Sequence, residues 1–101
     1  MARPFKCRKV VSEPRVYYFK PRAIPLYELE EITLQLDEFQ AIKYAELDRK
    51  AQTAAAKGMR ISRQTFGNIL ASARRKLADA VVNGKALKIQ GGPVKIMRRR
   101  L

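Results

Sequence analysis

The sequence contains no histidine, and Cys7 is its single cysteine. One cysteine cannot form a disulfide within the chain. Without histidine, a Cys/His zinc site and the Ser–His and Cys–His nucleophilic pairs are excluded as well. We therefore expect no metal and no other cofactor, and we predict that the chain is not an enzyme. An unpaired cysteine is typical of a protein in a reducing cytosol.

Long hydrophobic runs are also absent. No apolar stretch approaches the ~20 residues that span a bilayer. The basic N-terminus is not followed by the apolar stretch of a signal peptide. The sequence therefore predicts a cytoplasmic protein that does not enter a membrane. Its 101 residues are 47% hydrophobic, a composition that suits one small folded domain.

Acidic side chains are scarce, since 22 Lys and Arg stand against 9 Asp and Glu for a net charge of +13. The charge is also segregated along the chain. Residues 1–22 hold seven basic and one acidic side chain, residues 23–48 one and seven, and residues 49–101 fourteen and one. A solubility device would not need this segregation. A polyanionic partner is indicated, nucleic acid first and an anionic membrane surface second.

Apolar periodicity predicts three helices, over 36–48, 50–59 and 63–82. Ser62 is a good N-cap for the third helix, and Asn-Gly at 83–84 would end it. One face of that helix is apolar, with steps of three, one, three, four and four residues. This stripe consists of Phe66, Ile69, Leu70, Ala73, Leu77 and Val81.

The flanking segments predict little regular structure. We expect short strands in "RVYYFKP" (15–21) and "ALKIQGG" (86–92), and a helical turn followed by a loop over 26–35. The fold class is therefore predicted as mainly α, a three-helix helix-turn-helix flanked by two short β-strands. Three parts follow: a basic arm with strand and connector (1–35), the helix-turn-helix (36–85), and a strand with a mobile basic tail (86–101).

The second and third predicted helices meet the demands of a DNA-reading helix-turn-helix. Ala55 and Ala56 are small enough for the helices to cross closely. Ile61 supplies the apolar residue after the turn, and Ser62 caps the following helix. The order and spacing of these residues predict binding to double-stranded DNA.

The opposite face of the third helix carries side chains that can read bases. Arg, Gln and Asn make paired hydrogen bonds to guanine or adenine edges, so we assign base reading to Arg63, Gln64 and Asn68. Gly67 would let a backbone approach this bare face. The predicted phosphate contacts are Lys50, Lys57, Ser62, Thr65, Arg74, Arg75 and Lys76. The N-terminal arm adds Arg3, Lys6, Arg8 and Lys9, which either follow DNA or form a solvated tail.

The segments "CRKV" (7–10), "YFKPRAIPLYELEEITL" (18–34), "ISRQTF" (61–66) and "NGKALKIQGG" (83–92) carry a resemblance. The chain is similar to a family of small uncharacterised proteins of bacteria and archaea that are predicted to bind DNA. The helical part resembles region 4 of bacterial sigma factors. The resemblance implies a sigma-region-4-like helix-turn-helix that acts in transcription. The chain departs from the family at Arg60, where members usually have glycine. This departure affects the expected backbone conformation of the turn, because glycine tolerates a positive φ and arginine does so less freely.

Three further interpretations concern partners. The acidic residues Glu28, Glu30, Glu31, Asp37 and Glu38 either keep one side of the domain away from DNA or contact a basic protein such as RNA polymerase. Two short strands make a marginal sheet, so we hypothesise a homodimer that shares their apolar residues. The alternative to DNA binding is an RNA-binding or ribosome-associated protein. It ranks lower because the chain lacks a run of exposed aromatic residues for base stacking.

Overall fold

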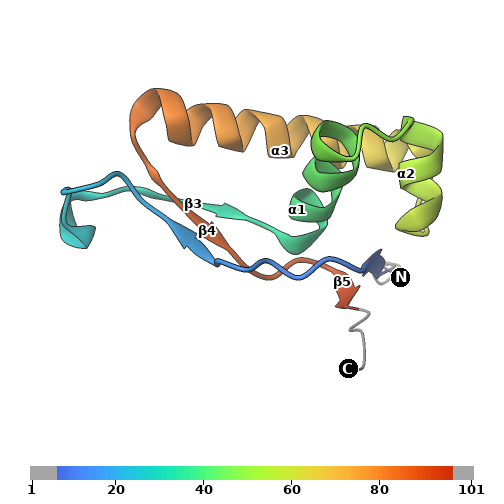
Figure 1. Cartoon of the computed structure of the whole chain (residues 1–101), viewed down its shortest axis with the longest axis horizontal. Coiled ribbons are helices and arrows are strands. Elements are labelled where there is room, and N and C mark those ends of the chain that lie inside the picture. The colour runs from blue at the N-terminus through green and yellow to red at the C-terminus, as the bar shows by residue number, and fades with distance from the viewer. Residues whose placement is uncertain (1–6, 97–101) are drawn as a thin grey trace, which may run out of the picture.

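The computed structural model describes residues 7–96, which form a small α/β domain of three helices and short strands (Figure 1). The longest element, α3, lies across one side of the molecule, and a ribbon of strands runs beneath it. The elements in chain order are β1 (Arg8–Val10), β2 (Tyr18–Phe19), η1 (Leu26–Glu28), β3 (Glu31–Leu34), α1 (Leu36–Ile42), η2 (Lys43–Leu47), α2 (Gln52–Gly58), α3 (Arg63–Asn83), β4 (Ala86–Ile89) and β5 (Val94–Ile96).

Two small sheets connect segments that are far apart in the sequence. In the three-stranded sheet β4 is central, antiparallel to β2 and parallel to β3, with Ile32 opposite Leu87. In the second sheet β1 pairs in parallel with β5, and Arg8 lies opposite Val94. Both ends of the described chain therefore close onto one another beside the helices.

The core has two parts that meet along α3. Phe66, Ile69 and Leu70 at the start of α3 pack against α1, η2 and α2. Ala73 and Ala80 farther along α3 pack against β3 and β4, including Leu87. The single helix α3 therefore connects the helical part of the domain to the sheet. Within residues 7–96, no helix is both long and apolar enough to cross a membrane.

The three predicted helices are confirmed: α1 and α3 begin at the predicted residues, α3 ends one residue later than predicted, and α2 is shorter by two residues at its start and one at its end. Residues 43–47, predicted as the end of the first helix, form the π-helical segment η2. Gly84 ends α3 in a left-handed conformation with φ 64°, as the Asn-Gly signal indicated. Val81 was placed in the apolar stripe of α3, but it is 83% exposed.

Three segments that the sequence assigned to an arm, a loop and a tail are strands in the structure, so these predictions are wrong. Residues 31–34 form β3 because Ile32, Thr33 and Leu34 are good strand formers and β4 is available as a partner. Residues 8–10 and 94–96, placed in the basic arm and the mobile tail, pair as β1 and β5. With five strands the fold is α/β, where the sequence had predicted mainly α.

Candidate nucleic-acid interface

The turn between α2 and α3 is fixed by backbone hydrogen bonds. Ile61 N donates to Ala56 O at 3.0 Å, and Arg60 N donates to Lys57 O at 3.1 Å. Arg60 itself has φ 58°, in the left-handed region. This combination is a Schellman motif, the helix ending that usually places glycine at the left-handed position. The chain therefore builds the turn with arginine in a conformation that suits glycine.

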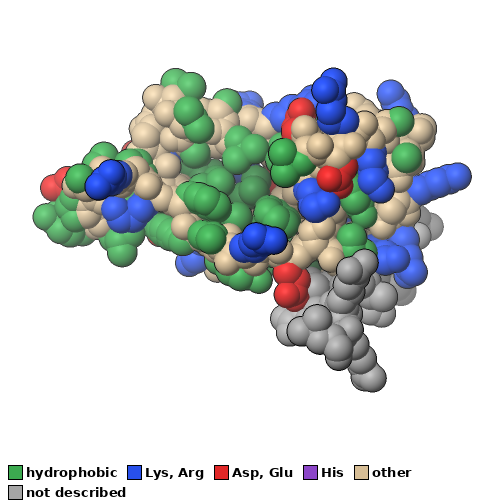
Figure 2. All heavy atoms as spheres, viewed as in Figure 1, with side chains coloured by type: hydrophobic (Ala, Val, Ile, Leu, Met, Phe, Trp, Pro, Cys, Tyr) green, Lys and Arg blue, Asp and Glu red, His purple; other side chains and the backbone are tan. Residues whose placement is uncertain are grey.

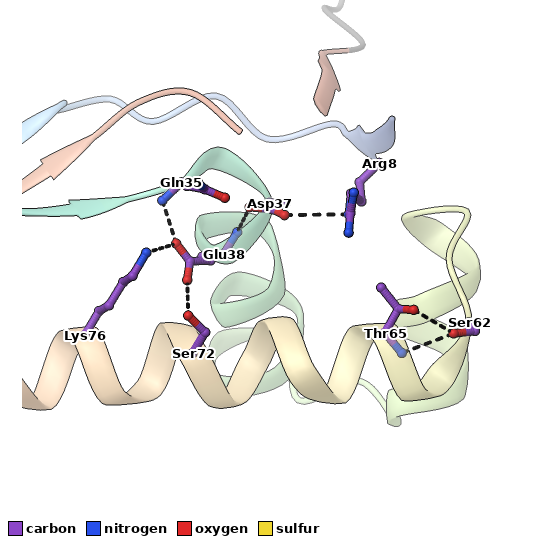
Figure 3. A network of polar contacts seen from close by, with 8 residues as sticks. All are labelled: Arg8, Gln35, Asp37, Glu38, Ser62, Thr65, Ser72 and Lys76. Carbon is purple, nitrogen blue, oxygen red and sulfur yellow. Dashed lines mark hydrogen bonds and ion pairs between the residues drawn. The ribbon is translucent and has the colours of Figure 1, made fainter. Parts of the chain in front are cut away.

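Ser62 begins α3 as predicted. Its Oγ accepts a hydrogen bond from Thr65 N at 3.1 Å and donates to Thr65 Oγ1 at 2.9 Å (Figure 3). The cap satisfies one backbone donor that the first turn of a helix leaves free. Both hydroxyls remain on the surface at the N-terminal end of α3, where backbone dipoles favour an anion such as a phosphate.

The predicted base-reading residues lie on the uncovered side of α3. Arg63, Gln64 and Asn68 are exposed, as is Arg75. Positions 64, 68 and 75 follow one helical face, because steps of four and seven residues return to the same side. This face lies opposite the buried residues of α3. Arg63, which the sequence placed on the same face, is exposed but lies about 100° round the helix from Gln64. Asn68 also borders a polar pocket shared with Arg8 and Ser72.

Gly67 lies near α2. A Cβ at this position would meet only Gln52 Oε1, at 3.6 Å, which is ordinary contact. Packing within the chain therefore does not require glycine here. At Gly58, in contrast, a Cβ would lie 3.1 Å from the Tyr44 hydroxyl. Packing against the ring of Tyr44 therefore favours glycine at this position.

Several predicted phosphate contacts lie on the surface around this face. Lys57 is exposed, and Lys50 Nζ lies 4.7 Å from the centre of the Tyr44 ring. Arg74 is more than half exposed, and its Nε donates to Glu46 Oε1 at 2.6 Å. In Figure 2, Lys and Arg side chains gather toward the end of the molecule that carries α2. This end also carries the start of α3.

Lys76, in contrast, has a structural role, which corrects its assignment to a phosphate. Its Nζ donates to Glu38 Oε1 at 2.7 Å (Figure 3). The same Nζ also donates to Thr33 O at 2.9 Å. Ser72 Oγ donates to the other oxygen of Glu38, and Gln35 N donates to Oε1 at 2.8 Å. Glu38 is buried, so these donors supply the hydrogen bonds that water would otherwise give. Lys76 and Ser72 thereby join α3 to the start of α1.

Arg8 also differs from its predicted role in a DNA-contacting arm. Its side chain is largely buried, with Nε 3.7 Å from Asp37 Oδ2 (Figure 3). Lys9 is half-buried in β1, and its N donates to Met59 O at 3.0 Å, so β1 adjoins the turn before α3. Arg3 and Lys6 lie outside the described residues.

The acidic stretch divides into two groups. Asp37 and Glu38 are buried, which their charge and their place in the first helical turn did not predict. Burial raises the pKa of Asp37, and the neighbouring Glu38 N and Arg8 guanidinium act in the opposite direction. Gln35 and Glu38 form a capping box at the start of α1, and their spacing of three residues is the sequence signal that fits the position of the Glu38 side chain. Glu28, Glu30 and Glu31 are exposed.

Comparison with known proteins places the chain in a family. Residues 1–97 match the sequence profile described as "Protein of unknown function DUF134". The chain belongs to this family. A UPF0251 protein of Caldanaerobacter subterraneus is 50% identical over 96 residues, which cover 95% of this chain and 81% of the relative.

Two further relatives are longer than this chain. A UPF0251 protein of Desulfosudis oleivorans is 50% identical over 92 residues, covering 91% of this chain and 67% of the relative. One of Prosthecochloris aestuarii is 48% identical over 92 residues, covering 91% and 59%. No solved structure matches the chain. The printed names of these relatives describe no activity.

Proposed function

We propose that this DUF134 protein binds double-stranded DNA in a sequence-specific manner and regulates transcription. In this proposal α2, the turn at Arg60 and α3 act as a helix-turn-helix of the sigma-region-4 kind. The observation that carries the proposal is the face of α3 opposite the core. It presents Gln64, Asn68 and Arg75 on one side of a capped, 21-residue helix.

The side chains of this face divide by position. Arg63, Gln64 and Asn68 lie in the first two turns of α3, the part of a recognition helix that meets base edges. Phosphates on either side would be held by exposed groups around them. These groups are Lys50, Lys57, Ser62 and Arg75, with the half-buried Thr65 beside Ser62. Arg74 can join them only by sharing its guanidinium with Glu46.

Two of the predicted cationic contacts have partners within the chain, and we leave them out of the proposed interface. Lys76 and Arg8 are held by buried carboxylates and are removed from the proposed interface. The remaining groups still surround α3 at the basic end. Contact with RNA polymerase through the acidic segment stays a prediction, now limited to the exposed residues Glu28, Glu30 and Glu31.

Binding of duplex DNA can be tested by fluorescence anisotropy at stated salt concentrations, using a selected duplex and a random duplex. Gln64→Ala should cost about 1–3 kcal/mol on the selected duplex and little on the random one. Gln90→Ala is the matched control, because Gln90 is exposed after the end of β4 and does not belong to α3. Equal weakening on both duplexes would contradict base reading by Gln64.

Single-stranded RNA is the competitor that tests the alternative function. Tyr17, Phe19 and Tyr27 are exposed, so the chain has more surface aromatic rings than the sequence indicated. They lie in or near β2 and η1, and none belongs to α3. Duplex DNA should displace RNA at matched salt. Preference for RNA, with loss of binding on Tyr17→Ala, would support the alternative instead.

A further inference from the structure

An apolar groove lies between the C-terminal half of α3 and the ribbon of β2, β4 and β3. Its volume is about 600 Å³. Leu77 and Val81 of α3 line one wall, and Phe19 and Leu87 line the sheet side. Figure 2 shows hydrophobic side chains gathered in this region, between the ribbon and α3. The sequence had indicated no such pocket.

The same end of the molecule carries an apolar protrusion. The turn η1 forms the tip of the ribbon in Figure 1, beyond the groove. Tyr27 is 86% exposed there, and Leu26 and Ile24 are exposed beside it. A concave and a convex apolar surface therefore lie next to each other on one chain.

Charge explains why copies of a strongly basic chain could meet at this end. Residues 15–34 contain three basic and three acidic side chains, and residues 77–90 contain two basic and one acidic. These segments, which form the protrusion and all of the groove except Phe39 and Ile42 of α1, contribute only one unit to the net charge of +13. Residues 49–76, in contrast, carry eight basic and no acidic side chains, so close approach of two copies at that part of the chain would be opposed by repulsion.

We propose that two copies of the chain associate at this end, each placing Leu26 and Tyr27 of η1 in the groove of the other. The arrangement is isologous, so the same two surfaces are used twice and the assembly closes as a dimer. It differs from the dimer expected from the sequence, in which strands shared their apolar residues. Leu87 and Ile89 are already buried within one chain.

Sedimentation equilibrium of the full chain without DNA tests this association. We expect wild type to be a dimer at micromolar concentration. The dissociation constant of the dimer should rise about tenfold or more for Tyr27→Ser and for Val81→Ser, because a symmetric dimer contains each substitution twice. Leu47→Ser is the matched control, since Leu47 is 77% exposed and does not line the groove. Equal weakening by the control would overturn the proposal.

Mixing the two weakened variants tests the reciprocal contact. A heterodimer of Tyr27→Ser and Val81→Ser retains one intact pairing of tyrosine with groove, so the mixture should associate more tightly than either variant alone. Absence of this rescue would overturn the insertion of η1. A wild-type protein that is monomeric at high micromolar concentration would also overturn the proposed insertion. This result would be clearest if a small apolar probe also binds equally to wild type and Tyr27→Ser. Neither result would bear on DNA binding by α3.

Discussion

Arg60 shows how one residue can depart from a preferred type without changing the fold. Its left-handed conformation places a side chain where glycine is usual, while both Schellman hydrogen bonds are kept. The exposed guanidinium adds positive charge beside the start of α3. Arginine therefore adds a positive charge at the proposed interface, in a backbone conformation that glycine adopts more readily.

Arg60→Gly should raise the free energy of unfolding by about 1 kcal/mol, because glycine adopts the left-handed conformation without steric cost. Urea unfolding monitored by circular dichroism measures the change. Arg60→Ala is the control, since it removes the charge but keeps the Cβ, and it should not stabilise. If both variants stabilise equally, charge repulsion and not backbone conformation is the cause.

Asp37 gives the domain a specific dependence on pH. Its pKa is raised, chiefly by burial, so the folded state holds the proton more tightly than the unfolded chain does. Stability from this group is therefore greatest below the ordinary value of 3.8 and falls as the pH rises through the folded pKa. Unfolding of wild type and Asp37→Asn should show this fall in wild type only.

The pKa of Asp79 is shifted in the opposite direction to that of Asp37. Hydrogen bonds from Asn83 and Lys85 lower the pKa of its carboxyl. Its contribution is present above 3.8 and is lost as the pH falls through the folded pKa. The difference between wild type and Asp79→Asn should therefore change with pH in the opposite direction to that of Asp37→Asn. The same direction for both would contradict the assigned causes.

At the scale of elements, α3 divides its polar residues between structure and surface. Lys76 and Ser72 face Glu38 at the start of α1, whereas Gln64, Asn68 and Arg75 face outward. Two adjacent basic residues, Arg75 and Lys76, therefore have different expected roles. This difference follows from the angle of about 100° between successive residues on a helix.

Lys76→Ala should lower the free energy of unfolding by about 2 kcal/mol, because the buried carboxylate of Glu38 loses its cation. The salt dependence of DNA binding should not change. Arg75→Ala should leave stability nearly unchanged and reduce the salt slope by about one, as expected for one lost phosphate contact. Arg22→Ala, on the near-neutral end, is the charge control and should leave the slope unchanged.

Gly67→Ala tests whether the glycine of α3 serves its surface. Because the added Cβ meets only Gln52 Oε1 at 3.6 Å, the substitution should stabilise the fold by about 1 kcal/mol. If a DNA backbone approaches this part of the helix, affinity should fall at the same time. Higher stability with unchanged affinity would show that the glycine has no part in binding.

The sequence predicted the elements that depend on local signals. The helices followed from apolar spacing, the cap at Ser62 and the Asn-Gly stop. Strands β1 and β5 were missed because they pair with each other across nearly the whole chain. The burial of Asp37 and Glu38 likewise depends on α3 crossing α1 and on β1 lying beside α1. Neither pairing nor crossing leaves a local pattern in the sequence.

At the scale of the whole molecule, charge and apolar surface are separated. The basic end carries α2 and the start of α3, and the near-neutral end carries the groove and η1. The 21 residues of α3 connect the two ends, a length of about 30 Å. A dimer formed at the near-neutral end would leave both basic ends outward. Two α3 helices could then meet two half-sites on one duplex.

Selection of bound sites from random duplex DNA, with wild type and Gln64→Ala in parallel, tests the central claim most directly. We expect one enriched motif for wild type and loss of preference at a defined position of that motif for the variant. Sequences no more enriched than random DNA, or the same motif with uniformly lower enrichment for Gln64→Ala, would contradict base reading by α3.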